Sequence, residues 1–163
     1  MRVALLSLLV AGWLTQPPAV ALARAQAPAA QPASALDFEF FKTRVQPIFL
    51  ASREGHTRCV SCHSKGTPMV LQRLAPGAAA WNEDQSRRNF QVVAARVVPY
   101  NLSQSKILVH PLLADGGGDF YHSGGKHWNS FLDPEWQTIA NWVCGRKAAE
   151  KLVELTGECG GAE

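Results

Sequence analysis

The sequence predicts an all-α fold. Apolar residues recur every three or four positions in segments 37–49, 81–98 and 133–144, a spacing that gives a helix one apolar face. Asp133-Pro134-Glu135-Trp136 is a strong helix start, with a capping aspartate and a proline at the first helical position. About 125 residues from Leu36 onward is an ordinary size for a single domain. We therefore expect one domain over residues 36–163.

The first 35 residues have the layout of an export leader. Arg2 precedes a short apolar run, and Ala21-Leu22-Ala23 fits a signal-peptidase cleavage site. The run is shorter than the roughly 20 residues of a comfortable membrane span, so cleavage is favoured over an uncleaved anchor. Residues 24–35 are mainly Ala, Pro and Gln, a composition typical of a flexible linker. The sequence thus predicts a signal peptide over residues 1–23, a flexible leader over 24–35 and a periplasmic protein.

The first predicted helix starts at Asp37, a plausible N-cap. Pro47 lies inside its apolar pattern and removes a backbone donor, so it should bend or loosen the helix. The apolar face of this helix comprises Phe38, Phe41, Val45, Ile48 and Phe49.

The helix is followed by Cys59-Val60-Ser61-Cys62-His63, a spacing typical of covalent haem attachment. Each cysteine adds to one vinyl group of the porphyrin, and His63 then binds the iron as proximal ligand. Two alternatives are half of a zinc site, with ligands recruited from Cys144, Cys159 or histidines, and a thioredoxin-like dithiol. The dithiol requires a strand before the motif and a helix after it, whereas here a helix-like segment comes first and Ser64-Lys65-Gly66-Thr67-Pro68 comes after.

Two further helices are predicted in the middle of the chain. Asn82 or Asp84 can cap a helix within 81–98, whose arginines either face solvent or reach a haem propionate. A shorter helix over 103–110 should end before Pro111. The glycines of 115–119 then predict a loop.

The segment 120–128 contains two of the five histidines, His122 and His127, among glycines and aromatic residues. These are candidates for the distal iron ligand. Met69 is a third candidate, since a thioether binds haem iron well, but it lies only six residues from His63. His110 is a fourth, and an open distal site is also conceivable. Candidate neighbours of the haem propionates are Arg73, Lys126, Trp128 and Trp136.

The last helix is predicted to reach at least Cys144, with a possible break at Gly145 before a second helical stretch over 146–155. A disulfide between Cys144 and Cys159 requires the chain to fold back, because an unbroken helix would separate them by roughly 22 Å. We lean towards this disulfide, with a folded-back C-terminal extension.

The helix leading into Cys-x-x-Cys-His and the final Asp-Pro-x-Trp helix with Asn141-Trp142-Val143 together resemble the class I mono-haem cytochromes c. The resemblance is greatest to a planctomycete-type bacterial branch with a His-x-Gly-Gly-Lys sequence, here His122-Ser123-Gly124-Gly125-Lys126. It implies that the first and last helices cross around one covalent haem. It also implies His63 and His122 as axial ligands, which would lower the reduction potential relative to His/Met ligation.

These features favour a single-electron carrier over an enzyme. The net charge of +3 includes Arg2, and no basic run suggests nucleic acid. Redox proteins, including a membrane respiratory complex, are the expected partners, without stable membrane insertion of this chain. The alternatives are a haem sensor or peroxidase-like enzyme with an open distal site, and a haem subunit whose extension from about residue 145 docks onto a larger redox complex.

Overall fold

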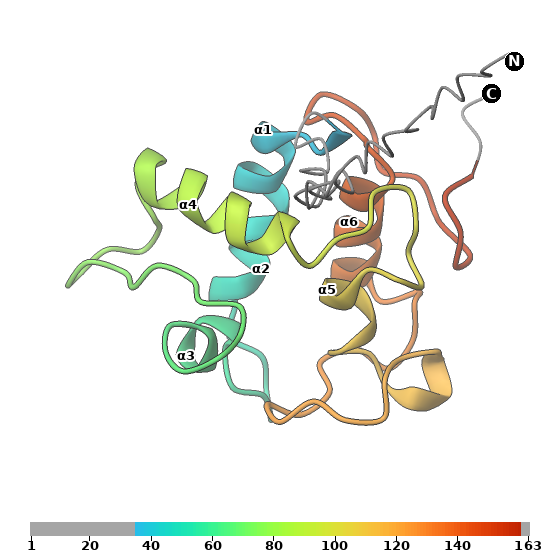
Figure 1. Ribbon diagram of the computed structural model, residues 1–163, viewed down its shortest axis with the longest axis horizontal. Helices are drawn as coiled ribbons and strands as arrows, with labels where there is room; N and C mark the ends of the chain where they lie inside the picture. The colour runs from blue at the N-terminus through green and yellow to red at the C-terminus, as the bar shows by residue number, and fades with distance from the viewer. Residues whose placement is uncertain (1–34, 161–163) are drawn as a thin grey trace, which may run out of the picture. The chain divides into compact units, whose positions relative to one another are not determined.

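The computed structural model describes residues 35–160, all within the unit formed by residues 31–163. The predicted signal peptide and nearly all of the leader lie outside the described residues. The regular secondary structure of residues 35–160 consists of helices and isolated β-bridges without a sheet, in agreement with the predicted all-α class (Figure 1). The helices are α1 (Phe38–Phe40), η2 (Phe41–Val45), α2 (Gln46–Leu50), α3 (Cys59–His63), α4 (Glu83–Ala94), α5 (Lys106–Val109), η3 (Ala114–Gly116) and α6 (Pro134–Val143).

The first helical stretch runs without a break through α1, η2 and α2. The Asp37 carboxylate accepts a hydrogen bond from the backbone N–H of Phe40 at 2.6 Å, which confirms the predicted cap. Pro47 cannot donate to the carbonyl of Thr43, and the π-helical turn η2 lies directly before it. The loosening expected at Pro47 is therefore present as a change of helix type.

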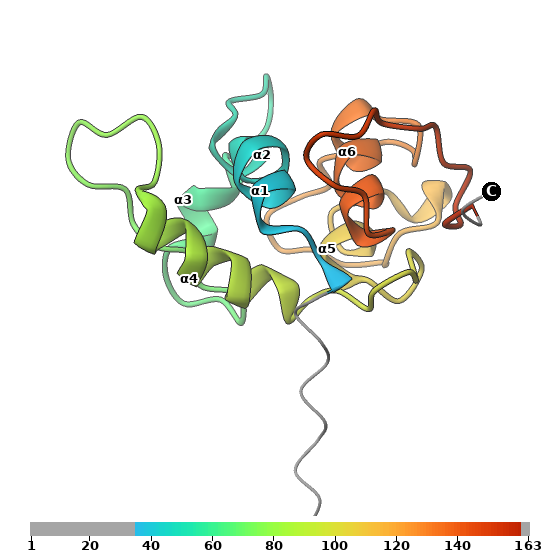
Figure 2. The same ribbon diagram turned by 90° about the horizontal axis from the view of Figure 1, so that it is seen from above.

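Three aromatic side chains connect this stretch with α4 and α6. The ring centre of Phe41 lies 5.5 Å from that of Phe90 and 5.4 Å from that of Trp142. The indole N–H of Trp142 donates to the carbonyl of Asp37 at 2.9 Å. The first and last helices of the domain therefore pack on each other, and Figure 2 shows α1 and α2 alongside α6.

Helix α4 lies within the segment 81–98, as predicted, and Asn82 is its cap. Asn82 and Gln85 form a reciprocal capping box. The helix ends at Ala94, and the N–H of its C-cap residue, Ala95, donates to the carbonyl of Gln91 at 3.2 Å. A tight turn follows, in which the N–H of Arg96 donates to Val93 at 2.8 Å. This turn directs the chain towards α5.

Helix α6 ends at Val143, Gly145 has a φ of +82°, and the predicted helix over 146–155 is wrong. Instead, the chain folds back as an extended segment along α6, and Leu155 is buried. Cys144 and Cys159 form a disulfide with a Cα–Cα distance of 5.4 Å, as the fold-back prediction required. We call residues 146–159 the C-terminal strap. No helix in residues 35–160 is long and apolar enough to cross a membrane.

Candidate functional site

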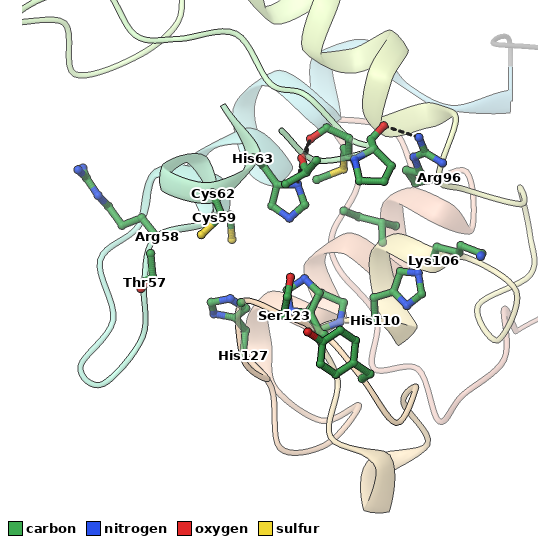
Figure 3. A pocket seen from close by; sticks show the side chains of 18 residues that line it. Thr57, Arg58, Cys59, Cys62, His63, Arg96, Lys106, His110, Ser123 and His127 are labelled. Carbon is green, nitrogen blue, oxygen red and sulfur yellow. Dashed lines mark hydrogen bonds between the residues drawn. The ribbon is translucent and has the colours of Figure 1, made fainter. Parts of the chain in front are cut away.

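A cavity of about 490 Å³ lies between α3, α5 and the loop that precedes α6 (Figure 3). Its volume falls within the range of about 300–1,000 Å³ typical of sites for small molecules and cofactors. It brings together residues from 57 to 127 of the chain. Its lining includes every residue proposed above as a haem anchor or iron ligand, namely Cys59, Cys62, His63, Met69, His110, His122 and His127.

The two thiols lie on helix α3, three residues apart and thus on one side of it. Both are free: Cys59 is half-buried and Cys62 is exposed. Burial raises the pKa of the Cys59 thiol, whereas a dithiol redox centre uses a cysteine whose pKa is lowered. The burial of Cys59 thus argues against the dithiol alternative.

His63 ends the same helix and is fixed through one ring nitrogen. Its Nδ1 donates to the carbonyl of Met69 at 3.0 Å and lies 3.1 Å from the Thr67 hydroxyl. Burial lowers the pKa of His63, which favours the neutral ring. A hydrogen bond of this kind fixes the tautomer and leaves Nε2 with a free lone pair, as metal-binding histidines require.

His122 is fixed in the same manner on the opposite wall. Its Nδ1 donates to the carbonyl of Gly125 at 2.6 Å, and the N–H of Gly125 closes a turn onto the carbonyl of His122 at 2.9 Å. Gly125 has a φ of +81°, a backbone conformation that glycine adopts readily. A Cβ at Gly124 would lie only 3.3 Å from the imidazole. The two glycines therefore shape the turn around the His122 ring.

The rings of His63 and His122 are nearly parallel, with planes 15° apart and centres 6.2 Å apart. Two metal–imidazole bonds of about 2 Å on opposite sides of one ion, plus about 1 Å from each nitrogen to its ring centre, require a separation of about 6 Å. The observed separation of the ring centres is thus the one that two imidazoles on opposite sides of a single ion would need. A haem would require only two such side chains, because its porphyrin provides four nitrogens.

His127 also lines the cavity but is held differently. Arg53 Nη1 lies 3.5 Å from His127 Nδ1, and because arginine can only donate, this nitrogen accepts. The neutral ring then carries its proton on Nε2 and has no free lone pair there. Burial, followed by the charge of Arg53, lowers the pKa of His127 to about 4. These contacts favour His122 over His127 as an iron ligand.

His110 and Met69 occupy less suitable positions. His110 Nδ1 pairs with the Asp119 carboxylate, and Figure 3 shows His110 below Lys106, at the far end of the cavity from Cys59. Met69 is buried, and its carbonyl accepts the hydrogen bond from His63. Its backbone therefore lies on the proximal side of the site.

Four of the propionate neighbours suggested by the sequence do not line this cavity, namely Arg73, Lys126, Trp128 and Trp136, whereas Arg96 from the segment 81–98 does. The ammonium group of Lys126 instead donates to the carbonyls of His110 and Asp119. Trp128 lines a smaller adjoining void. Arg53 is a residue that the sequence could not reveal, because it lies in a connector and its partners His127 and Glu135 are 74 and 82 positions away.

The structure also bears on the zinc alternative. Cys144 and Cys159 are consumed in the disulfide and cannot join Cys59 and Cys62 around an ion. Within residues 35–160, no group of three or more His, Cys, Asp and Glu side chains is arranged to hold a metal ion. Comparison with protein-family models, curated proteins and solved structures yields no match for the chain.

Proposed function

We propose that this chain is a mono-haem c-type cytochrome that carries single electrons between redox partners. Cys59 and Cys62 would hold the haem through thioether bonds, and His63 and His122 would bind its iron. The observation that carries the proposal is the presence of these four side chains in one cavity, with two parallel imidazoles at the spacing that axial ligation requires.

The haem supplies a centre that gains and loses one electron. The protein's part is to keep both axial positions filled, so that neither oxygen nor a substrate reaches the metal. Fixed Nδ1 hydrogen bonds on both imidazoles support this role, because they restrain the ligands in either oxidation state. The proposed function is therefore electron transfer without catalysis.

The class I cytochrome c fold is part of the proposal. It is supported by the packing of the first helical stretch on α6 through Phe41 and Trp142, and by the placement of the Cys-x-x-Cys-His helix directly after that stretch. The periplasm is the proposed location, supported by the export-like leader sequence and by the disulfide, which is expected in an oxidising compartment. The proposed partners are redox proteins, soluble or in a membrane complex.

Near-infrared magnetic circular dichroism of the ferric protein, purified from a host that attaches haem c, tests the proposal. The expected result is one haem that stays with the chain after denaturation, with the charge-transfer band of bis-histidine ligation. A His/Met band would transfer the distal role to Met69. A high-spin spectrum would favour the sensor or peroxidase-like alternative, and lack of covalent haem would refute the cytochrome.

Matched variants identify the distal ligand. His122→Ala should convert the spectrum to high spin, while His127→Ala should retain the bis-histidine band because His127 binds Arg53 instead. His56→Ala, at an exposed position, is the control for loss of a histidine. The reverse pattern, with His127→Ala alone producing high spin, would contradict the assignment of His122.

A further inference from the structure

Three cationic side chains line the cavity, and they lie at its two ends. Figure 3 shows Arg58 beside Cys59 and Cys62, whereas Arg96 and Lys106 lie at the opposite end. No aspartate or glutamate is among the lining residues that the structure describes. The end of the cavity remote from the cysteines is therefore suited to an anionic group.

The chemistry of haem places its anionic groups there. The two vinyl groups that react with cysteines are on adjacent pyrroles, and the two propionates are on the other two. The carboxylates therefore lie across the macrocycle from the thioether bonds. We propose that Arg96 and Lys106 bind these carboxylates and so determine the orientation of the haem, an inference that rests on the proposed function.

The guanidinium of Arg96 is held beside the cavity. Its Nη2 donates to the carbonyl of Pro68 at 2.5 Å, which fixes the group at the cavity wall. Its Nε is covered by protein, so a carboxylate in the cavity would bind the other donors of the guanidinium. A carboxylate is the acceptor that a guanidinium binds most strongly.

Lys106 is held next to Arg96 by the backbone. The N–H of Ile107 donates to the carbonyl of Arg96 at 3.2 Å, so the first turn of α5 lies against the turn that follows α4. Lys106 is exposed, and its flexible stem allows the ammonium group to approach a second carboxylate. Two adjacent cations thus match two propionates.

The test uses Arg96→Gln and Lys106→Met in the full-length holoprotein, with Arg58→Gln as the matched control at the cysteine end of the cavity. The readouts are the propionate bending band in the resonance Raman spectrum and the reduction potential. Each of the first two variants should shift the band. Each should also move the ferrous–ferric equilibrium towards the ferric form by roughly fivefold, the effect of one partly exposed charge pair.

Arg58→Gln should leave the propionate band unchanged. An unchanged band in both Arg96→Gln and Lys106→Met, or a shift in Arg58→Gln alone, would overturn the proposal. Because Arg96 also supports Pro68, the Lys106→Met variant keeps the test valid if Arg96→Gln perturbs folding. The wild-type spectrum separates the two hypotheses. If the wild type holds no covalent haem, the proposed function fails. If it holds bis-histidine haem and the propionate band is unaltered in both Arg96→Gln and Lys106→Met, only this inference fails.

Discussion

Two buried amide side chains of α6, Gln137 and Asn141, replace the backbone pairing that a strand would provide. Asn141 exchanges two hydrogen bonds with the backbone of Val153, at 2.8 and 2.9 Å. Gln137 does the same with Leu155, at 2.7 and 2.8 Å. These residues lie one helical turn apart on α6 and contact alternate residues of the C-terminal strap. The strap is therefore held by four specific hydrogen bonds.

Asn141→Ala removes both hydrogen bonds to Val153. The backbone N–H and carbonyl of Val153 then lack these partners. We expect a loss of about 1–3 kcal/mol in the free energy of unfolding, the usual cost of losing hydrogen bonds at a buried site. Denaturant unfolding monitored by tryptophan fluorescence measures the change. Asn129→Ala, at an exposed position, is the control and should stay close to wild type. Equal stability of the two variants would contradict this role.

At the scale of residues, the features that the sequence predicts correctly are those set by contacts between residues close together in the chain. The caps at Asp37, Asn82 and Asp133 follow from hydrogen bonds to residues two or three positions away. The His122 ring is likewise held by Gly125, three positions on. The contact between Arg53 and His127 spans 74 positions, and no local pattern encodes it.

At the scale of elements, the segment from α5 to Trp128 is closed by Lys126. Its ammonium group joins the carbonyl of His110, at the end of α5, to that of Asp119. Two backbone bonds support the closure: the N–H of Asp119 donates to Val109 at 2.8 Å, and that of His127 to Pro111 at 2.7 Å. His122 lies between these fixed points, so Lys126 stabilises the segment that carries the proposed distal ligand.

Lys126→Met should loosen this segment without unfolding the helices. A hydrogen bond from a charged group contributes about 1.5–3 kcal/mol, so the amide protons of Asp119 and His127 should exchange roughly tenfold faster or more. Native-state hydrogen exchange measures this with or without bound haem. Lys151→Met, at an exposed position of the strap, is the control. Unchanged exchange at both amides in Lys126→Met would show that the backbone bonds close the segment alone.

The helices differ in how well the sequence predicts them. Helix α6 combines a local start signal with an apolar stripe, and the sequence predicts both correctly. The helix predicted over 146–155 is wrong because distant contacts decide that segment. Gly145 turns the chain, Asn141 and Gln137 bind its backbone, and Cys159 joins it to the end of α6. None of these contacts leaves a periodic signal in residues 146–155.

At the scale of the whole domain, the strap and the cavity use separate parts of the chain. The cavity is lined by residues between Thr57 and His127, whereas the disulfide closes the chain between Cys144 and Cys159. Replacing Cys144 and Cys159 by serine opens a loop whose ends are 15 residues apart. Loop-closure entropy predicts that the free energy of unfolding falls by about 3 kcal/mol. Denaturant unfolding measures the loss, and reducing the wild-type disulfide should reproduce it.

The same double-serine variant shows whether the strap docks as one unit. If the disulfide and the amide pairs hold the same segment, freeing its end allows it to detach, and Asn141→Ala then removes contacts that are only partly formed. The cost of Asn141→Ala should therefore be smaller in the double-serine variant than in wild type, by about 0.5 kcal/mol or more. Additive losses would show instead that the amide pairs hold the strap independently of the disulfide. The axial-ligand spectrum should be unchanged in every strap variant, because no strap residue lines the cavity.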